Sequence, residues 1–183
     1  MIKGYLKMDR FLEMVVVKHQ RMMNEVLYYL TAVVMVVSAI IAMFMLQVLM
    51  YGFDVFTLVL ALLNAAIAVA LFFTRDKLRM EYEYTFTNGS LDFAQVFNNK
   101  KRKNLGSLNC KTVDVFGKVD SNAFRRYISM PNVKQTRWFL NRGAELYFFY
   151  FQKEGNKRVI VFEPNEQLVE YIRFYLPHGA YQE

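Results

Sequence analysis

The chain has 183 residues, 55% of them hydrophobic, and a formal net charge of +7. This hydrophobic content exceeds the roughly 45–50% of a typical soluble domain. It is concentrated in two uncharged runs, which argues against an ordinary soluble protein. The single cysteine, Cys110, excludes an intramolecular disulfide and agrees with a reducing compartment.

Residues 1–26 are predicted to form a cytoplasmic amphipathic segment. At about 100° per residue, its basic side chains share one arc and its apolar side chains an adjoining face. Such a segment either lies among lipid headgroups or extends the first span and orients it. Met8, followed by Asp9, is a second candidate start of the protein. If translation begins there, Lys3 and Lys7 are absent. The basic residues are Lys3, Lys7, Arg10, Lys18 and Arg21.

Residues 27–50 and 55–73 are predicted to cross the membrane as helices. The runs hold 24 and 19 residues without Asp, Glu, Lys, Arg or His, and a span needs about 20. Residues 51–54 form a short external turn, so the spans are antiparallel. Lys and Arg flank only the opposite ends, which predicts a multi-pass protein of the cell membrane with both termini in the cytoplasm. Without charged residues, the spans offer no transport path.

Two polar residues are expected to guide packing inside the membrane. Ser38 and Asn64 lie at similar depths near the bilayer centre when counted outward from the turn. An unpaired amide is costly there, so Asn64 should face protein. The choice is between a hydrogen bond within the hairpin, which we favour, and an Asn64-mediated homodimer.

From residue 80 the pattern changes to the alternation of a mainly antiparallel β domain, residues 80–183. Asn88-Gly89 lies between two such strands and is typical of a type I′ hairpin turn. Apolar residues at helical spacing follow Glu163-Pro164 and predict a terminal helix. Residues 117–132 are ambiguous between a long connection and a short helix at 122–128. The predicted strands are 80–87, 91–97, 103–108, 111–116, 133–140, 145–152 and 157–162, and the helix is 165–176.

Seven strands followed by one helix is the element order of pleckstrin-homology-like (PH-like) domains. The stretches at residues 81–89, 100–105 and 162–166 resemble a family of small bacterial two-span membrane proteins, the domain of unknown function 6106. The resemblance implies a seven-stranded PH-like barrel with a C-terminal helix behind the transmembrane hairpin. By analogy it implies a binding or scaffold role, and it supplies no site residues to transfer.

Residues for catalysis are scarce. His19 precedes the first span, His178 lies in the tail, and Cys110 stands alone. A Cys110–His178 nucleophile and base has nothing to hold it together, so a buried structural cysteine is the preferred interpretation. Phosphate-binding glycine motifs and metal-ligand clusters are absent from the sequence. We therefore predict a protein that is not an enzyme and that needs no cofactor or metal.

The sequence feature most like a binding site is the basic run Lys100, Lys101, Arg102 and Lys103. Because the run follows the second span closely, anionic headgroups of the cytoplasmic leaflet are its nearest polyanion. The alternatives are a solvated turn that only helps orientation, and nucleic-acid binding helped by Trp138 and Phe139. Tethering to the membrane makes nucleic acid the less favoured partner. A membrane protein or a second copy remains a possible partner.

Overall fold

The computed structural model describes residues 9–182 and divides them into two compact units. One unit is a β domain made of residues 9–18, 81–96 and 102–182. The other holds two long helices, residues His19–Met80, together with the short segment Phe97–Lys101. The predictions for Lys3 and Lys7 and the choice between Met1 and Met8 as the start concern residues outside the described part of the chain.

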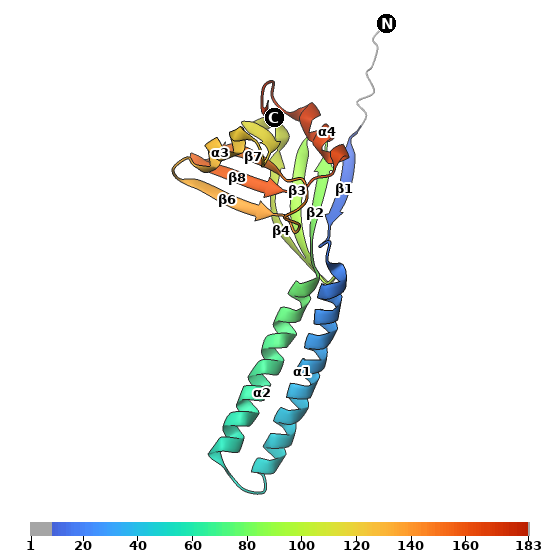
Figure 1. Ribbon diagram of the computed structural model, residues 1–183, viewed down its shortest axis with the longest axis vertical. Coiled ribbons are helices and arrows are strands. Elements are labelled where there is room, and N and C mark those ends of the chain that lie inside the picture. The colour runs from blue at the N-terminus through green and yellow to red at the C-terminus, as the bar shows by residue number, and fades with distance from the viewer. Residues whose placement is uncertain (1–8, 183) are drawn as a thin grey trace. The chain divides into compact units, whose positions relative to one another are not determined.

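The helical unit is an antiparallel hairpin of α1 (Arg21–Leu49) and α2 (Val55–Thr74), continued by the short 3-10 helix η1 (Arg75–Arg79) (Figure 1). Asp54 caps α2, because its carboxylate accepts a hydrogen bond from the Thr57 amide at 2.9 Å. Both helices are long and apolar enough to cross a membrane, and only 11% and 6% of the residues in their most apolar windows are buried. Uncovered apolar helices of this length are typical of membrane proteins.

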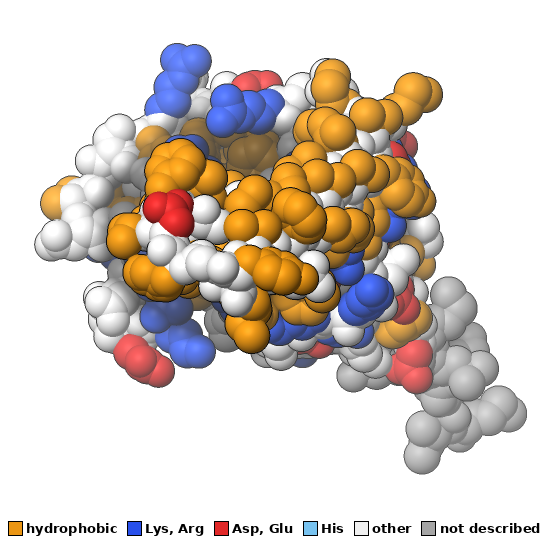
Figure 2. Space-filling model, turned by 90° about the horizontal axis from the view of Figure 1, so that it is seen from below, with side chains coloured by type: hydrophobic (Ala, Val, Ile, Leu, Met, Phe, Trp, Pro, Cys, Tyr) orange, Lys and Arg blue, Asp and Glu red, His pale blue; other side chains and the backbone are white. Residues whose placement is uncertain are grey.

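Hydrophobic side chains cover the hairpin when it is seen from the side of its turn (Figure 2). The residues buried between the helices are small: Ser38 and Ala42 from α1, and Ala61 from α2. Small side chains let two backbones approach closely where no hydrophobic effect drives association. The large apolar side chains therefore point outward, where lipid would cover them.

The β domain begins before the long helices, and within the amphipathic segment expected at residues 1–26 this corrects the helical periodicity at residues 11–16. Residues Phe11–Val16 form β1, which pairs antiparallel with β2 (Met80–Thr87), Val16 opposite Tyr82. Leu12, Met14 and Val16 lie on one face of the strand, so strand alternation describes this segment better than helical spacing. The whole helical hairpin is thus inserted into the connection between two neighbouring strands.

Nine strands in two open sheets replace the expected seven-stranded barrel within residues 9–182. One sheet has the order β1-β2-β3-β4 and the other β6-β8-β7-β5-β9. Cys110–Thr112 is a 3-10 turn, which shortens the strand expected at 111–116, and the ambiguous connection contains a helix. The remaining elements are β3 (Ser90–Phe97), β4 (Lys101–Asn109), β5 (Val115–Lys118), α3 (Asn122–Ile128), β6 (Val133–Trp138), β7 (Tyr147–Lys153), β8 (Asn156–Phe162), α4 (Glu166–Tyr175) and β9 (Tyr181–Gln182).

The expected Asn88-Gly89 turn is confirmed, with φ values of +49° and +95°. Tyr147, Phe148, Phe149, Tyr150 and Phe151 are all buried, because β7 is an interior strand of its sheet with both faces covered.

An aromatic core joins the two sheets. Phe162 of β8 stacks on Phe149 with ring centres 4.8 Å apart, and its edge meets Tyr84 of β2 at 5.7 Å. Phe93 of β3 packs on Trp138 of β6 at 4.6 Å. On the far face of the second sheet, α3 places Tyr127 4.4 Å from Tyr150. Aromatic pairs add about 0.5–1.5 kcal/mol each to the burial of their surface.

The insertion of the hairpin between paired strands makes a separable domain expected. In a chain in which residues 18–80 are replaced by Asn-Gly, Val17 would face Glu81 across a two-residue turn and the observed register of β1 with β2 would be kept. We expect this chain to be soluble and to show the near-ultraviolet circular dichroism of packed aromatic rings. The matched control is residues 80–182 alone, which lacks β1 and should lose that signal.

Candidate functional site

The basic run lies where β3 turns into β4. Lys100 ends the turn, Lys101, Arg102 and Lys103 begin β4, and all four side chains are exposed. Arg102 forms an ion pair with Glu83 at 2.9 Å. Such surface pairs contribute about 0–1 kcal/mol. The three lysines form no salt bridge with a carboxylate among residues 9–182, so most of the positive charge of the run is available to a ligand.

Two consecutive asparagines build this turn. Asn98 and Asn99 have φ values of +50° and +52°, and the Lys100 amide donates to the Phe97 carbonyl at 3.0 Å. Positive φ at both central residues is the type I′ arrangement, and asparagine adopts it more readily than other residues with a side chain. The turn therefore presents Lys100 and Lys101 immediately after a rigid bend.

The side chain of Asn98 ties this turn to the ends of the helices. Its amide nitrogen donates to Asp76 Oδ1 at 2.9 Å and to the Tyr28 hydroxyl at 3.1 Å. Its amide oxygen accepts from Arg79 at 3.2 Å, and its backbone amide donates to the Arg79 carbonyl at 2.9 Å. We call Glu25, Tyr28, Asp76, Arg79 and Asn98 the polar collar.

Arg79 is the central cation of the polar collar. It pairs with Glu25 of α1, and its guanidinium carbon lies 3.7 Å from the centre of the Tyr28 ring. A partly buried cation over an aromatic face gains up to about 2 kcal/mol. The collar thus brings together three segments that are distant in the sequence: the start of α1, η1 and the β3–β4 turn.

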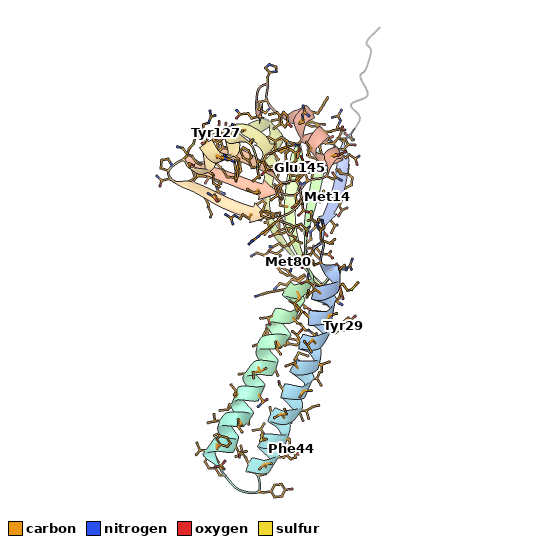
Figure 3. All side chains as sticks on the ribbon, viewed as in Figure 1. Met14, Tyr29, Phe44, Met80, Tyr127 and Glu145 are labelled. Carbon is orange, nitrogen blue, oxygen red and sulfur yellow. The ribbon has the colours of Figure 1, made fainter. Side chains whose placement is uncertain are left out.

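The two polar residues predicted inside the spans have separate environments. Ser38 of α1 is buried between the two helices. Asn64 donates its amide hydrogen to the Leu60 carbonyl of its own helix at 2.9 Å. This bond satisfies one donor of the amide without Ser38, and the role of Asn64 in packing or association stays a prediction. In Figure 3, Tyr29 lies toward the collar end of α1 and Phe44 toward the end nearer the turn.

The residues considered for catalysis are not arranged for it. Cys110 is fully buried, whereas His178 lies in an exposed loop. Burial raises the pKa of the Cys110 thiol to about 12. The thiolate is the nucleophilic form, so this cysteine is inert at neutral pH.

Cys110 should therefore resist thiol reagents in the folded protein. At pH 8 we expect maleimide labelling of the native chain to be at least about a hundredfold slower than after denaturation in urea, because of the low thiolate fraction and the burial. The raised pKa of Cys110 also makes the stability of the fold depend on pH. The stabilisation from the buried, neutral thiol is fully present below pH 9, the ordinary pKa of cysteine, and is lost as pH rises toward 12. Equal labelling of native and unfolded chains would contradict this prediction.

The aromatic residues considered for nucleic-acid stacking are half-buried and pack against the core. Trp138 packs on Phe93, and Phe139 packs against the buried cluster of Val115, Phe148 and Tyr150. A stacking platform needs exposed ring faces. The ring faces of Trp138 and Phe139 that pack against the protein are therefore not available to stack on a base.

Sequence reasoning missed a buried network around Glu163. Its carboxylate accepts from the Asn141 side chain at 2.8 Å and from the Asn141 backbone amide at 3.1 Å. The Asn141 side chain also donates to the Val17 carbonyl at 2.9 Å, which fixes the end of β1. Tyr84 donates to the Trp138 carbonyl beside this network, and burial raises the pKa of its hydroxyl. An acidic residue directly after an apolar strand was the only signal in the sequence.

Comparison with known proteins agrees with this architecture. No curated protein and no solved structure matches the chain significantly. The family model described as bacterial PH-like domain (DUF6106) matches residues 8–182, which include β1, both long helices and the complete β domain. PH-like domains are generally non-catalytic binding modules. The protein therefore belongs to the DUF6106 family of bacterial PH-like domain proteins.

Proposed function

We propose that this protein is a membrane-anchored, non-enzymatic binding protein whose PH-like domain contacts anionic lipid at the inner leaflet. Both termini lie in the cytoplasm, and the two long helices cross the membrane as a hairpin. The distribution of charge supports this orientation. The turn between the helices, residues 51–54, has no Lys or Arg, while Arg75, Lys77 and Arg79 lie at the opposite end.

The polar collar carries the proposal. Through Asn98 it fixes the β3–β4 turn to the ends of the helices, so Lys100 and Lys101 belong to the same compact unit as the apolar hairpin. With the hairpin in a bilayer, the collar lies at the level where apolar helix gives way to charged residues. That level is the headgroup layer, where each Lys or Arg gains about 1 kcal/mol from an anionic leaflet.

Footprinting of lysines in the full-length protein tests the contact. The protein is placed in nanodiscs of phosphatidylcholine or of a mixture with phosphatidylglycerol, and lysine acetylation is followed by mass spectrometry. We expect acetylation of Lys100 and Lys101 to be slowed about fivefold by phosphatidylglycerol, since about 1 kcal/mol corresponds to that factor. Lys153, exposed at the β7–β8 turn, is the matched internal control.

The alternatives give different results in the same experiment. Equal acetylation in both lipids would refute the headgroup contact. Protection that appears only in native membranes would instead indicate a protein partner, to be identified by crosslinking. Protection by added single-stranded nucleic acid in neutral nanodiscs would favour that ligand. A membrane-impermeant acetylating reagent should modify Lys100 and Lys101 in cells only after the membrane is opened.

A further inference from the structure

A groove of about 390 Å³ runs between α1 and α2 on the outside of the hairpin. Its lining is entirely apolar. The space exists because Ala39 and Ala68 are small and lie among large neighbours, chiefly Met35, Met43, Phe72 and Phe73. Its volume falls within the range of about 300–1,000 Å³ that is usual for small-molecule sites.

The groove begins in the half of the hairpin nearer the turn and extends toward the polar collar. At 1.5 Å per residue, its lining extends from about 9 Å above the turn at Met43 to about 27 Å at Phe73. The hydrocarbon core of a bilayer is about 30 Å thick. With the turn outside, the part of this interval beyond about 15 Å lies at the depth of an acyl chain in the inner leaflet.

A cation lies at the headgroup end of the groove. The guanidinium carbon of Arg75 is 5.8 Å from the ring centre of Phe72, which lines the groove, and equally 5.8 Å from that of Tyr28 in the polar collar. The Nε atom of Arg75 lies 4.0 Å from Oδ1 of Asp76, which is too far for a tight ion pair. Within residues 9–182, Arg75 Nε is a buried donor with no hydrogen-bond partner. An apolar groove capped by an undersatisfied cation is complementary to an amphiphile with an anionic head.

We propose that this groove binds one acyl chain of an anionic phospholipid, with the lipid phosphate at Arg75. The inference rests on the proposed membrane insertion of the hairpin and adds a defined lipid site to it. A helix from a second copy is a poorer occupant. At this level of the hairpin the carboxylates of Glu25 and Asp76 are already engaged by Arg79 and Asn98, so a copy offers no unengaged anion for Arg75.

Native mass spectrometry of the full-length protein tests the site. The protein is purified in detergent with equal amounts of phosphatidylglycerol and phosphatidylcholine that carry the same chains. We expect one retained lipid, with phosphatidylglycerol enriched about fivefold by the charge of Arg75. Ala68→Phe fills the groove and should abolish retention. Ile67→Phe, at an exposed position at least about 100° around α2 from each of its groove-lining residues, should leave it unchanged.

A second pair of variants separates chain from headgroup. Arg75→Gln should keep the retained lipid but lose the preference for phosphatidylglycerol, whereas Lys77→Gln, the same charge change at an exposed neighbour, should keep the preference. Ala39→Ile fills the groove from α1 and replaces Ala68→Phe if that variant loses its helical circular dichroism.

Three results would overturn the proposal: no retained lipid in the natural protein, equal effects of Ala68→Phe and Ile67→Phe, or a dimer that Ala68→Phe converts to monomer. The last would identify a second copy as the occupant. The acetylation pattern of Lys100 and Lys101 is measured in the same variants. The two lysines are still protected from acetylation if only the groove assignment is wrong, and they are not protected if the headgroup contact itself is wrong.

Discussion

Replacing Phe162 with alanine is expected to lower the free energy of unfolding of the β domain by about 3–5 kcal/mol. Phe162 has no exposed surface and joins both sheets through Phe149, Tyr84 and Phe93. The smaller side chain leaves a cavity that rigid strands on both sides cannot close. The loss therefore includes contacts as well as hydrophobic transfer.

Urea denaturation of the full-length protein in detergent micelles measures this effect. Trp138 is the only tryptophan and packs on Phe93, so its fluorescence follows the β domain and not the helices. Phe174→Ala is the matched control, because Phe174 is 65% exposed and contacts Arg10 and Tyr175 at the surface. We expect the control to change stability by less than about 1 kcal/mol. Similar midpoints for both variants would mean that Phe162 is not central to the core.

Glu163→Gln is expected to destabilise the same domain by about 2–3 kcal/mol although the side-chain volume hardly changes. The Glu163 carboxylate accepts hydrogen bonds from the Asn141 side chain and from the Asn141 amide. Both oxygens of a carboxylate accept, whereas glutamine replaces one of them with an NH₂ donor that would face other donors. One buried donor then loses its partner.

The same Trp138 measurement applies to this variant, with Glu170→Gln as control. Glu170 lies on the exposed side of α4, so Glu170→Gln should change the free energy of unfolding by less than about 0.5 kcal/mol. A second readout is specific to the network. Since Asn141 also holds the Val17 carbonyl, hydrogen exchange should accelerate at the end of β1 in Glu163→Gln. Unchanged exchange there together with unchanged stability would refute the assigned role.

Local patterns were sufficient for much of the fold. The apolar runs, the Asn88-Gly89 turn and the two-sided apolar strand Tyr147–Lys153 each depend on side chains that are near one another in sequence. The N-terminal strand was not predicted because Phe11, Leu12 and Val15 fit both a helix face and a strand. What decides between them is pairing with β2 across the whole helical hairpin. The closed barrel failed for a similar reason, since the parallel pairing of β6 with β8 is a long-range feature.

The candidate site was predicted in its charges but not in its position. Lys100 to Lys103 are conspicuous as a run, whereas the polar collar forms only when Tyr28, Asp76 and Asn98 converge from three segments. The Asn98-Asn99 pair was a usable signal, because consecutive asparagines favour a turn with positive φ. The groove beside Arg75 depends on the relative rotation of two helices, which no local pattern specifies.

The insertion of the hairpin between β1 and β2 also sets the order of events during synthesis. Val16 must pair with Tyr82, 66 residues later, and at about 5–20 residues per second β1 waits roughly 3–13 seconds for its partner. If the second helix failed to insert, the two strands would emerge on opposite sides of the membrane and the sheet could not form. In a chain anchored in the membrane, a folded β domain would therefore require that the two helices either both cross the bilayer or both stay out of it.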